Sequence, residues 1–125
     1  KRMFGVYGAG VNKLHRDAIG GLALAPALTL ALHTQGEVIY WRYLDYEPPQ
    51  SRRIGEIFSE ASGYTLEETP FASGFAGYKD WFIESFDRPG YTIEAGRGIN
   101  PLPIGQFDEI FEDNLGILTL APLLI

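Results

Sequence analysis

The 125-residue chain has no cysteine and only two histidines, His15 and His33. Without cysteine it forms neither disulfide bonds nor thiolate metal sites. Basic residues are also few, because ten Lys and Arg stand against sixteen Asp and Glu, and the net charge is −6. No basic patch with interleaved aromatic residues is present, which argues against nucleic acid as a partner.

Long apolar segments are missing as well. The most apolar stretch, residues 22–32, contains Pro26 and ends at His33. It is too short to cross a membrane, and it lies too far inside the chain to be a signal peptide. The chain begins with Lys1 rather than Met, so we expect a processed product or a fragment.

The sequence does contain enough apolar material for a folded domain. Hydrophobic residues make up 46% of the chain and aromatic residues 14%, a composition that excludes a disordered chain. We expect a single domain over residues 1–125. Residues 1–21 are glycine-rich and without a period, and are predicted to be irregular, whereas residues 22–125 are predicted to form a core of sheet and helices.

Four segments are typical of strands. Residues 27–32 and 91–94 are continuous apolar runs, which suit strands covered on both faces, and we expect both to be central in the sheet. Residues 37–42 are predicted to form a third strand. Residues 64–68 are predicted to form an edge strand, because Glu67 and Glu68 discourage further pairing.

Three segments show the spacing of helices. Residues 51–62 follow two prolines and end before Gly63, and residues 78–86 repeat aromatic residues at helical spacing. The last helix is expected to place an apolar stripe on the core, opposite a solvated acidic face; the stripe consists of Ile104, Phe107, Ile110, Phe111 and Leu118. Because strands alternate with helices, the predicted class is α/β, with a partial, mixed and mostly parallel sheet and flanking helices.

Two of the predicted strands end in residues that can do chemistry. The first ends at His33, and the strand 91–94 ends at Glu94, just before a glycine-rich loop. In open α/β sheets, functional residues gather at the carboxyl ends of strands. Taken alone, each residue also has an ordinary structural interpretation: a histidine bonded to the backbone, and a glutamate paired with Arg97. The other histidine, His15, is interpreted as an exposed loop residue.

Three segments of the sequence resemble parts of a known family. The segment LHTQGEVIYW at residues 32–41 resembles the region around the third zinc ligand of the zinc carboxypeptidases, which have the carboxypeptidase A-like fold. The segments GYKDWF at 77–82 and YTIEAGRG at 91–98 resemble the family's approach to its general-base glutamate. The combination is most similar to the bacterial branch that cleaves γ-D-glutamyl-diaminopimelate bonds in peptidoglycan stem peptides. The resemblance covers residues 27–121.

The resemblance implies roles for particular residues. It places a zinc-binding histidine on His33 and the catalytic glutamate on Glu94, with zinc as the cofactor and a peptide or peptidoglycan stem peptide as the substrate. In the family, the glutamate takes a proton from the attacking water and passes it to the leaving amine. Arg97 and Tyr78 are expected to contact substrate; Tyr64 is another candidate for a substrate-contacting tyrosine.

The departures from the family matter equally. The family's first two zinc ligands form a His-x-x-Glu motif upstream of the third, and no such motif occurs here. A catalytic zinc site needs three protein ligands. The chain is therefore expected to be the C-terminal part of a metallopeptidase domain, truncated or internally shortened, and inactive by itself.

An alternative from a different class stays open. The chain could be a degenerate, metal-free peptidase-like domain that acts as an interaction module. An upstream His-x-x-Glu in the encoding gene would favour the peptidase. We also expect a homo-oligomer, because the missing strands and helices of a full peptidase would have covered apolar surface that is exposed here. The bacterial cytoplasm and the cell wall are both compatible with the sequence.

Overall fold

The computed structural model describes residues 26–73 and 77–125, so the predicted irregular segment 1–21 lies outside the described residues. The described part contains four strands and three longer helices: β1 (Thr29–His33), β2 (Val38–Tyr40), α2 (Ser51–Ser62), β3 (Thr65–Glu67), α3 (Tyr78–Phe86), β4 (Gly90–Glu94) and α4 (Phe107–Leu120). Three short 3-10 turns accompany them, at Phe71–Ser73, Ile104–Gln106 and Ala121–Leu123.

The four strands form one mixed sheet in the order β1-β4-β2-β3. β1 runs parallel to β4, β2 runs parallel to β3, and only the β2–β4 pair is antiparallel. This arrangement confirms the predicted α/β class with a mixed, mostly parallel sheet. β3 lies at one edge of the described sheet, as predicted.

The position of β1 differs from the prediction. The strand 91–94, now β4, is central, but β1 lies at the other edge of the sheet that the structure describes. The prediction that residues 27–32 are central is therefore wrong for this sheet. The reason is topological: β2 follows β1 in the sequence but pairs with the far side of β4, so β4 takes the place between them.

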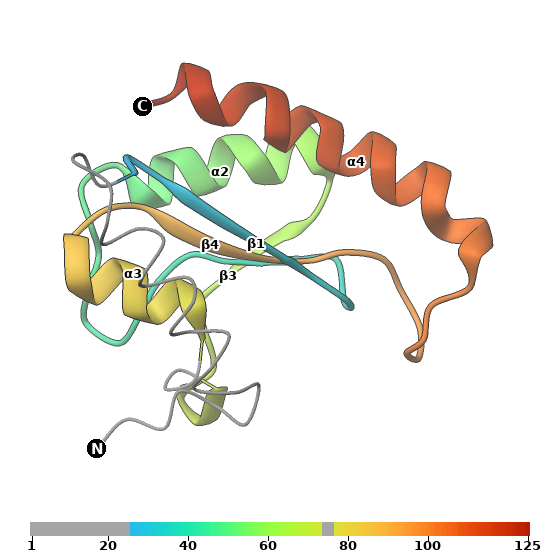
Figure 1. The fold of residues 1–125 in the computed structure, drawn as a ribbon, viewed down its shortest axis with the longest axis horizontal. Coiled ribbons are helices and arrows are strands. Elements are labelled where there is room, and N and C mark those ends of the chain that lie inside the picture. The colour runs from blue at the N-terminus through green and yellow to red at the C-terminus, as the bar shows by residue number, and fades with distance from the viewer. Residues whose placement is uncertain (1–25, 74–76) are drawn as a thin grey trace.

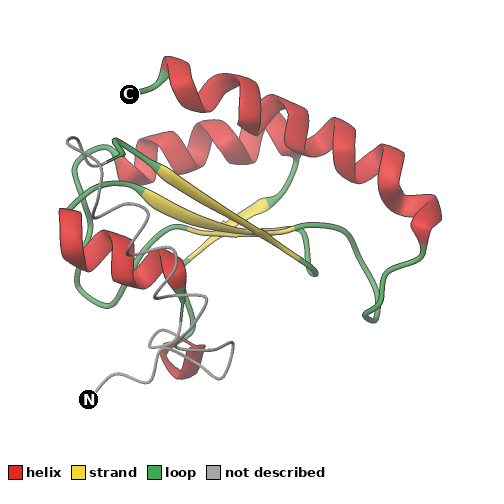
Figure 2. Ribbon diagram, viewed as in Figure 1, coloured by secondary structure: helices red, strands yellow, loops and turns green. Residues whose placement is uncertain are grey.

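The helices cover the two faces of the sheet unequally. Figure 1 shows α2 and α4 side by side on one face of the sheet and α3 on the other. Figure 2 shows the same layers coloured by secondary structure. The main core lies under α2 and α4, where Phe58, Tyr91, Ile93 and Ile117 are fully buried. α3 packs against β1 and β4. Within the described residues, no helix is both long enough and apolar enough to span a membrane.

Two of the three predicted helices have the expected bounds. α2 ends at Ser62, and Gly63 follows in the left-handed conformation, with its N–H donating to the Ser59 carbonyl, as glycine at this position commonly does. α3 likewise spans the predicted residues 78–86. α4 begins only at Phe107, because the preceding three residues form a 3-10 turn.

The predicted stripe of α4 is largely wrong. Phe107, Phe111 and Leu118 are 59%, 53% and 46% exposed, and α4 instead buries Asn114 and Ile117. Gly116 explains the rotation, because its missing side chain lets α4 approach Ala61 of α2 closely. The line of contact therefore runs through Asn114 and Ile117.

Candidate functional site

The two predicted strand-end residues lie next to each other. His33 and Glu94 are register partners at the ends of the parallel strands β1 and β4. Register partners project from the same face of a sheet, with neighbouring strands about 4.8 Å apart. The Ala95 N–H donates to the His33 carbonyl over 2.8 Å, which holds the two strand ends together.

Both side chains lie on the face opposite the main core. Tyr91 and Ile93 of β4 are in the core under α2 and α4, so the alternating residue Glu94 projects to the α3 side. α3 covers the other end of that face, since Ile83 and Lys79 lie close to Gly90 at the start of β4. His33 is exposed and Glu94 half-buried, which leaves the pair accessible at the uncovered end.

The electrostatic surroundings of Glu94 suit a proton acceptor. Burial raises the pKa of its carboxyl, and the electrostatic interaction with His33 lowers that pKa in part. A carboxylate with a raised pKa binds a proton more readily than one in water. This is the property that a general base requires.

Hydrogen bonds join the loop after β1 to the loop after β4, beyond the ends of these two strands. The loop after β1 passes across the end of β4, and the Gly36 N–H donates to the Gly96 carbonyl over 2.8 Å. The Thr34 hydroxyl donates to the Asn100 side-chain oxygen over 2.9 Å, and the Asn100 amide donates back to the Thr34 carbonyl over 3.3 Å. Residues 34–36 and 96–100 therefore form one rim beside His33 and Glu94.

Arg97 stands on this rim and does not pair with Glu94. Its guanidinium makes an ion pair with Glu37 over 2.5 Å and is 74% exposed. Gly96 is in the left-handed conformation, with φ of 75°, and reverses the chain before Arg97. The Arg97 N–H donates to the Gln106 side-chain oxygen, and the Gln106 side-chain amide donates to the Arg97 carbonyl. The alternative interpretation of Glu94 as a partner of Arg97 is thus wrong.

The two candidate tyrosines lie away from the strand-end pair. The Thr29 hydroxyl donates to the Tyr78 hydroxyl over 3.1 Å, which places Tyr78 at the start of β1 rather than at its end. Tyr64 is only 2% exposed, and its hydroxyl accepts a hydrogen bond from the Asn114 amide. The structure brings His33, Glu94 and Arg97 to one end of the sheet and leaves both tyrosines elsewhere.

The donor set for a metal is incomplete. Among residues 26–73 and 77–125, no three His, Asp or Glu side chains gather as a metal site requires. His33 offers one imidazole, beside the Glu94 carboxylate. An imidazole is a suitable zinc ligand, but a catalytic zinc needs three protein ligands. These residues therefore fit one position of such a site and not the whole of it.

Sequence reasoning missed two polar residues on the same face. Tyr40 of β2 is the register partner of Thr92, the residue two places before Glu94, and Glu67 of β3 is the register partner of Tyr40. The sequence alone indicates for Glu67 only the role of a charge that discourages pairing at a sheet edge. The signal was the alternation around the buried Ile39, which puts Tyr40 on the opposite face from the core.

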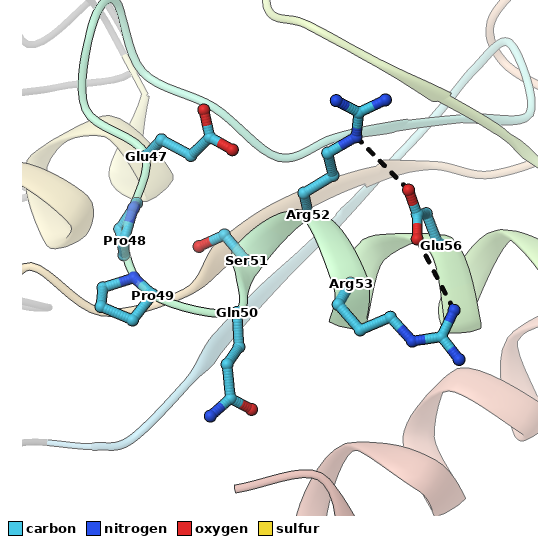
Figure 3. Close-up of a pocket in the computed structure, with 8 residues that line it drawn as sticks. All are labelled: Glu47, Pro48, Pro49, Gln50, Ser51, Arg52, Arg53 and Glu56. Carbon is cyan, nitrogen blue, oxygen red and sulfur yellow. Dashed lines mark ion pairs between the residues drawn. The ribbon is translucent and has the colours of Figure 1, made fainter.

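A separate hollow of about 540 Å³ lies at the start of α2 (Figure 3). It is lined by Glu47, Pro48, Pro49, Gln50, Ser51, Arg52, Arg53 and Glu56. Both arginines reach the Glu56 carboxylate in Figure 3, at 3.3 and 3.6 Å. Because β2 runs antiparallel to β4, the chain that leads into α2 leaves the sheet at the end away from Glu94. The hollow is therefore separate from the strand-end site.

Comparison with known proteins relates the chain to a peptidase. It is 54% identical over 91 residues to gamma-D-glutamyl-L-diamino acid endopeptidase 1 of Lysinibacillus sphaericus, covering 73% of this chain and 22% of that protein. It is also 45% identical over 96 residues to the uncharacterized protein YqgT of Bacillus subtilis (strain 168), covering 77% of this chain and 26% of that protein. The chain thus spans roughly a quarter of the length of these curated relatives. No protein-family model matches the chain.

Proposed function

We propose that this chain is the C-terminal part of the catalytic domain of a zinc-dependent peptidase. The proposed enzyme belongs to the carboxypeptidase A-like family and hydrolyses γ-D-glutamyl-diamino acid bonds of peptidoglycan stem peptides. The observation that carries the proposal is the register pairing of the exposed His33 with Glu94 at one end of the sheet, in a chain 54% identical to part of a γ-D-glutamyl-L-diamino acid endopeptidase.

Each residue of the site has a proposed task. His33 holds one coordination position of the metal, and the chemistry that zinc supplies in such a site is Lewis acidity, which lowers the pKa of water and polarises a carbonyl. Glu94 accepts the proton of the attacking water and delivers it to the nitrogen of the leaving diamino acid. The exposed Arg97 guanidinium binds the carboxylate that a γ-linked D-glutamyl residue leaves free.

The missing ligands belong to another part of the polypeptide. On its β4 side, His33 has Glu94 as its neighbour, whereas the outer edge of β1 carries no strand within the described residues. That open edge gives a further strand, with ligands at its end, room to lie beside His33. We propose that the active form carries an upstream His-x-x-Glu there.

Variants of that longer form test the proposal. Glu94→Gln should abolish turnover of a γ-D-glutamyl-diamino acid peptide, because the amide cannot act as a base. The variant should retain the metal, because the Glu94 carboxylate is not one of its ligands. His33→Ala should lose both metal and turnover. Zinc content and hydrolysis rate, measured together on each variant, check this. A Glu94→Gln enzyme with full activity would refute the assignment of the base.

The metal-free interaction module is the second candidate. The incomplete donor set among the described residues favours it. An upstream His-x-x-Glu in the encoding gene would favour the peptidase over this candidate, and zinc analysis on the purified 125-residue chain, beside its intact mass, tests whether this chain alone forms a metal site. We expect weak or no zinc binding and no turnover, and stoichiometric tight zinc with turnover would show that other residues of this chain complete the site.

A further inference from the structure

Two rows of side chains cross the sheet on the face that α3 leaves uncovered. The first row contains His33 and Glu94, followed by Val38 and Thr65 on the next two strands. The second row lies two residues away and ends with Thr92 of β4, Tyr40 of β2 and Glu67 of β3. Residues diagonal to one another on neighbouring strands are within reach of aromatic and long side chains. Tyr40 therefore stands between Glu94 and Glu67.

The second row presents a carboxylate that has no cationic partner among the residues that the structure describes. Glu67 is exposed and makes no ion pair within the described residues, whereas its neighbour Glu68 pairs with Arg42 and Glu37 pairs with Arg97. Tyr40 is half-buried. Burial, then Glu67, then Glu94 raise the pKa of its phenol, so the hydroxyl is neutral at physiological pH and surrounded by negative potential. A cation is the group that this surface would attract.

The substrate named for the relative contains such a group. An L-diamino acid carries a second amino group, which is protonated at neutral pH unless it is acylated. Its first amino nitrogen is in the scissile bond and would receive the proton from Glu94. The second amino group therefore extends from the position of Glu94 along the leaving-group side.

We propose that Tyr40 and Glu67 form the subsite that binds the distal ammonium group of the diamino acid. The inference rests on the proposed function, because it takes Glu94 as the origin of the leaving group. The Glu67 carboxylate pairs with the ammonium group, and the Tyr40 hydroxyl accepts one of its N–H hydrogens while the ring covers the aliphatic part of the side chain. Both residues are then specificity determinants and take no part in bond cleavage.

The spacing of the sheet agrees with this assignment. Glu67 lies two strands and two residues from Glu94, which corresponds to a Cα separation of about 12 Å. The two amino nitrogens of an extended diamino acid such as lysine are on the order of 7 Å apart, given bonds of about 1.5 Å. Two glutamate side chains that reach toward each other from those positions can contact both nitrogens at once.

A pair of substrates separates this role from catalysis. The longer peptidase form is assayed with a γ-D-glutamyl-L-lysine peptide and with its γ-D-glutamyl-L-norleucine analogue, which has a similar length but no ammonium group. We expect wild-type kcat/KM to favour lysine by about tenfold or more. Glu67→Gln should reduce that preference to within about twofold by slowing lysine cleavage only, and Tyr40→Phe should reduce it several-fold.

The controls make the outcomes distinct. Glu60→Gln makes the same charge change at an exposed position of α2 and should leave the lysine preference unchanged. An unchanged preference in Glu67→Gln, or an equal loss on both substrates, would overturn the subsite. Cleavage of neither substrate by the wild-type enzyme would overturn the proposed function, and the subsite with it.

Discussion

Among single residues, Tyr91 is expected to make the free energy of unfolding depend on pH. Its hydroxyl is buried and donates to the Ser51 carbonyl over 2.6 Å. Burial raises the pKa of the Tyr91 phenol above its ordinary value of 10. A group whose folded-state pKa is raised contributes stability below its unfolded pKa and loses it as pH rises. The free energy of unfolding should therefore fall as pH rises above 10.

Tyr91→Phe tests this contribution. The substitution leaves the Ser51 carbonyl without its partner, and we expect a loss of about 1–3 kcal/mol at pH 7. It also removes the group that titrates, so the stability of the variant should decline less steeply above pH 10 than that of wild type. Urea unfolding at pH 7 and at several pH values above 10 measures both effects. Parallel profiles would contradict the prediction, and the exposed Tyr46→Phe is the matched control.

Single residues also show what the sequence could and could not reveal about the site. The proximity of His33 and Glu94 could be predicted because each ends an apolar run, and strand ends of parallel neighbours meet at one edge. The alternative that pairs Glu94 with Arg97 is wrong, because Arg97 follows the left-handed Gly96 and its guanidinium pairs with Glu37. Tyr40 and Glu67 were missed because their proximity depends on the register of β2 with β4 and β3, which no local pattern encodes.

For the helices and strands, the residues that begin and end each element determined what could be predicted. α2 and α3 have the predicted bounds because prolines and glycines flank them, and these residues act within a few positions along the chain. The strand order could not be predicted in this way. β4 is inserted between two strands that are consecutive in the sequence, and that order arises from pairing between residues 52 to 61 positions apart.

The contact between α2 and α4 depends on one glycine. A Cβ atom at Gly116 would lie 3.1 Å from the Ala61 Cβ and 3.2 Å from the Ala61 carbonyl oxygen. Alanine gains about 1 kcal/mol over glycine in a helix, but overpacking against a helix backbone typically costs about 1–3 kcal/mol. Gly116→Ala should therefore lower the free energy of unfolding by about 1 kcal/mol.

The matched control for this substitution is Gly105→Ala. A Cβ atom at Gly105 meets no atom within 4 Å, so the free energy of unfolding should change little or rise. Thermal or urea unfolding of the two variants beside wild type checks the contrast. A Gly116→Ala protein more stable than wild type would show that α4 can move away from α2 without loss.

At the scale of the whole molecule, the described part leaves much apolar surface uncovered. Ile104, in the turn before α4, and Phe107, Phe111, Leu115 and Leu118 of α4 are each at least 45% exposed. The rings of Phe107 and Phe111 stack on each other, with their centroids 6.1 Å apart. The outer edge of β1 has no neighbouring strand within the described residues. Exposed apolar patches and open strand edges both favour association.

We therefore predict that the isolated 125-residue chain associates with copies of itself through the exposed face of α4. The net charge of −6 opposes contact between copies, and salt screens that repulsion. Association should accordingly increase with protein concentration and with added salt. Replacement of both Phe107 and Phe111 by serine should weaken it, whereas Ile99→Ser, at an 87% exposed loop position, should not. Sedimentation velocity over a range of concentrations measures the distribution, and a monomer at every concentration and salt level would show that this apolar face does not drive association.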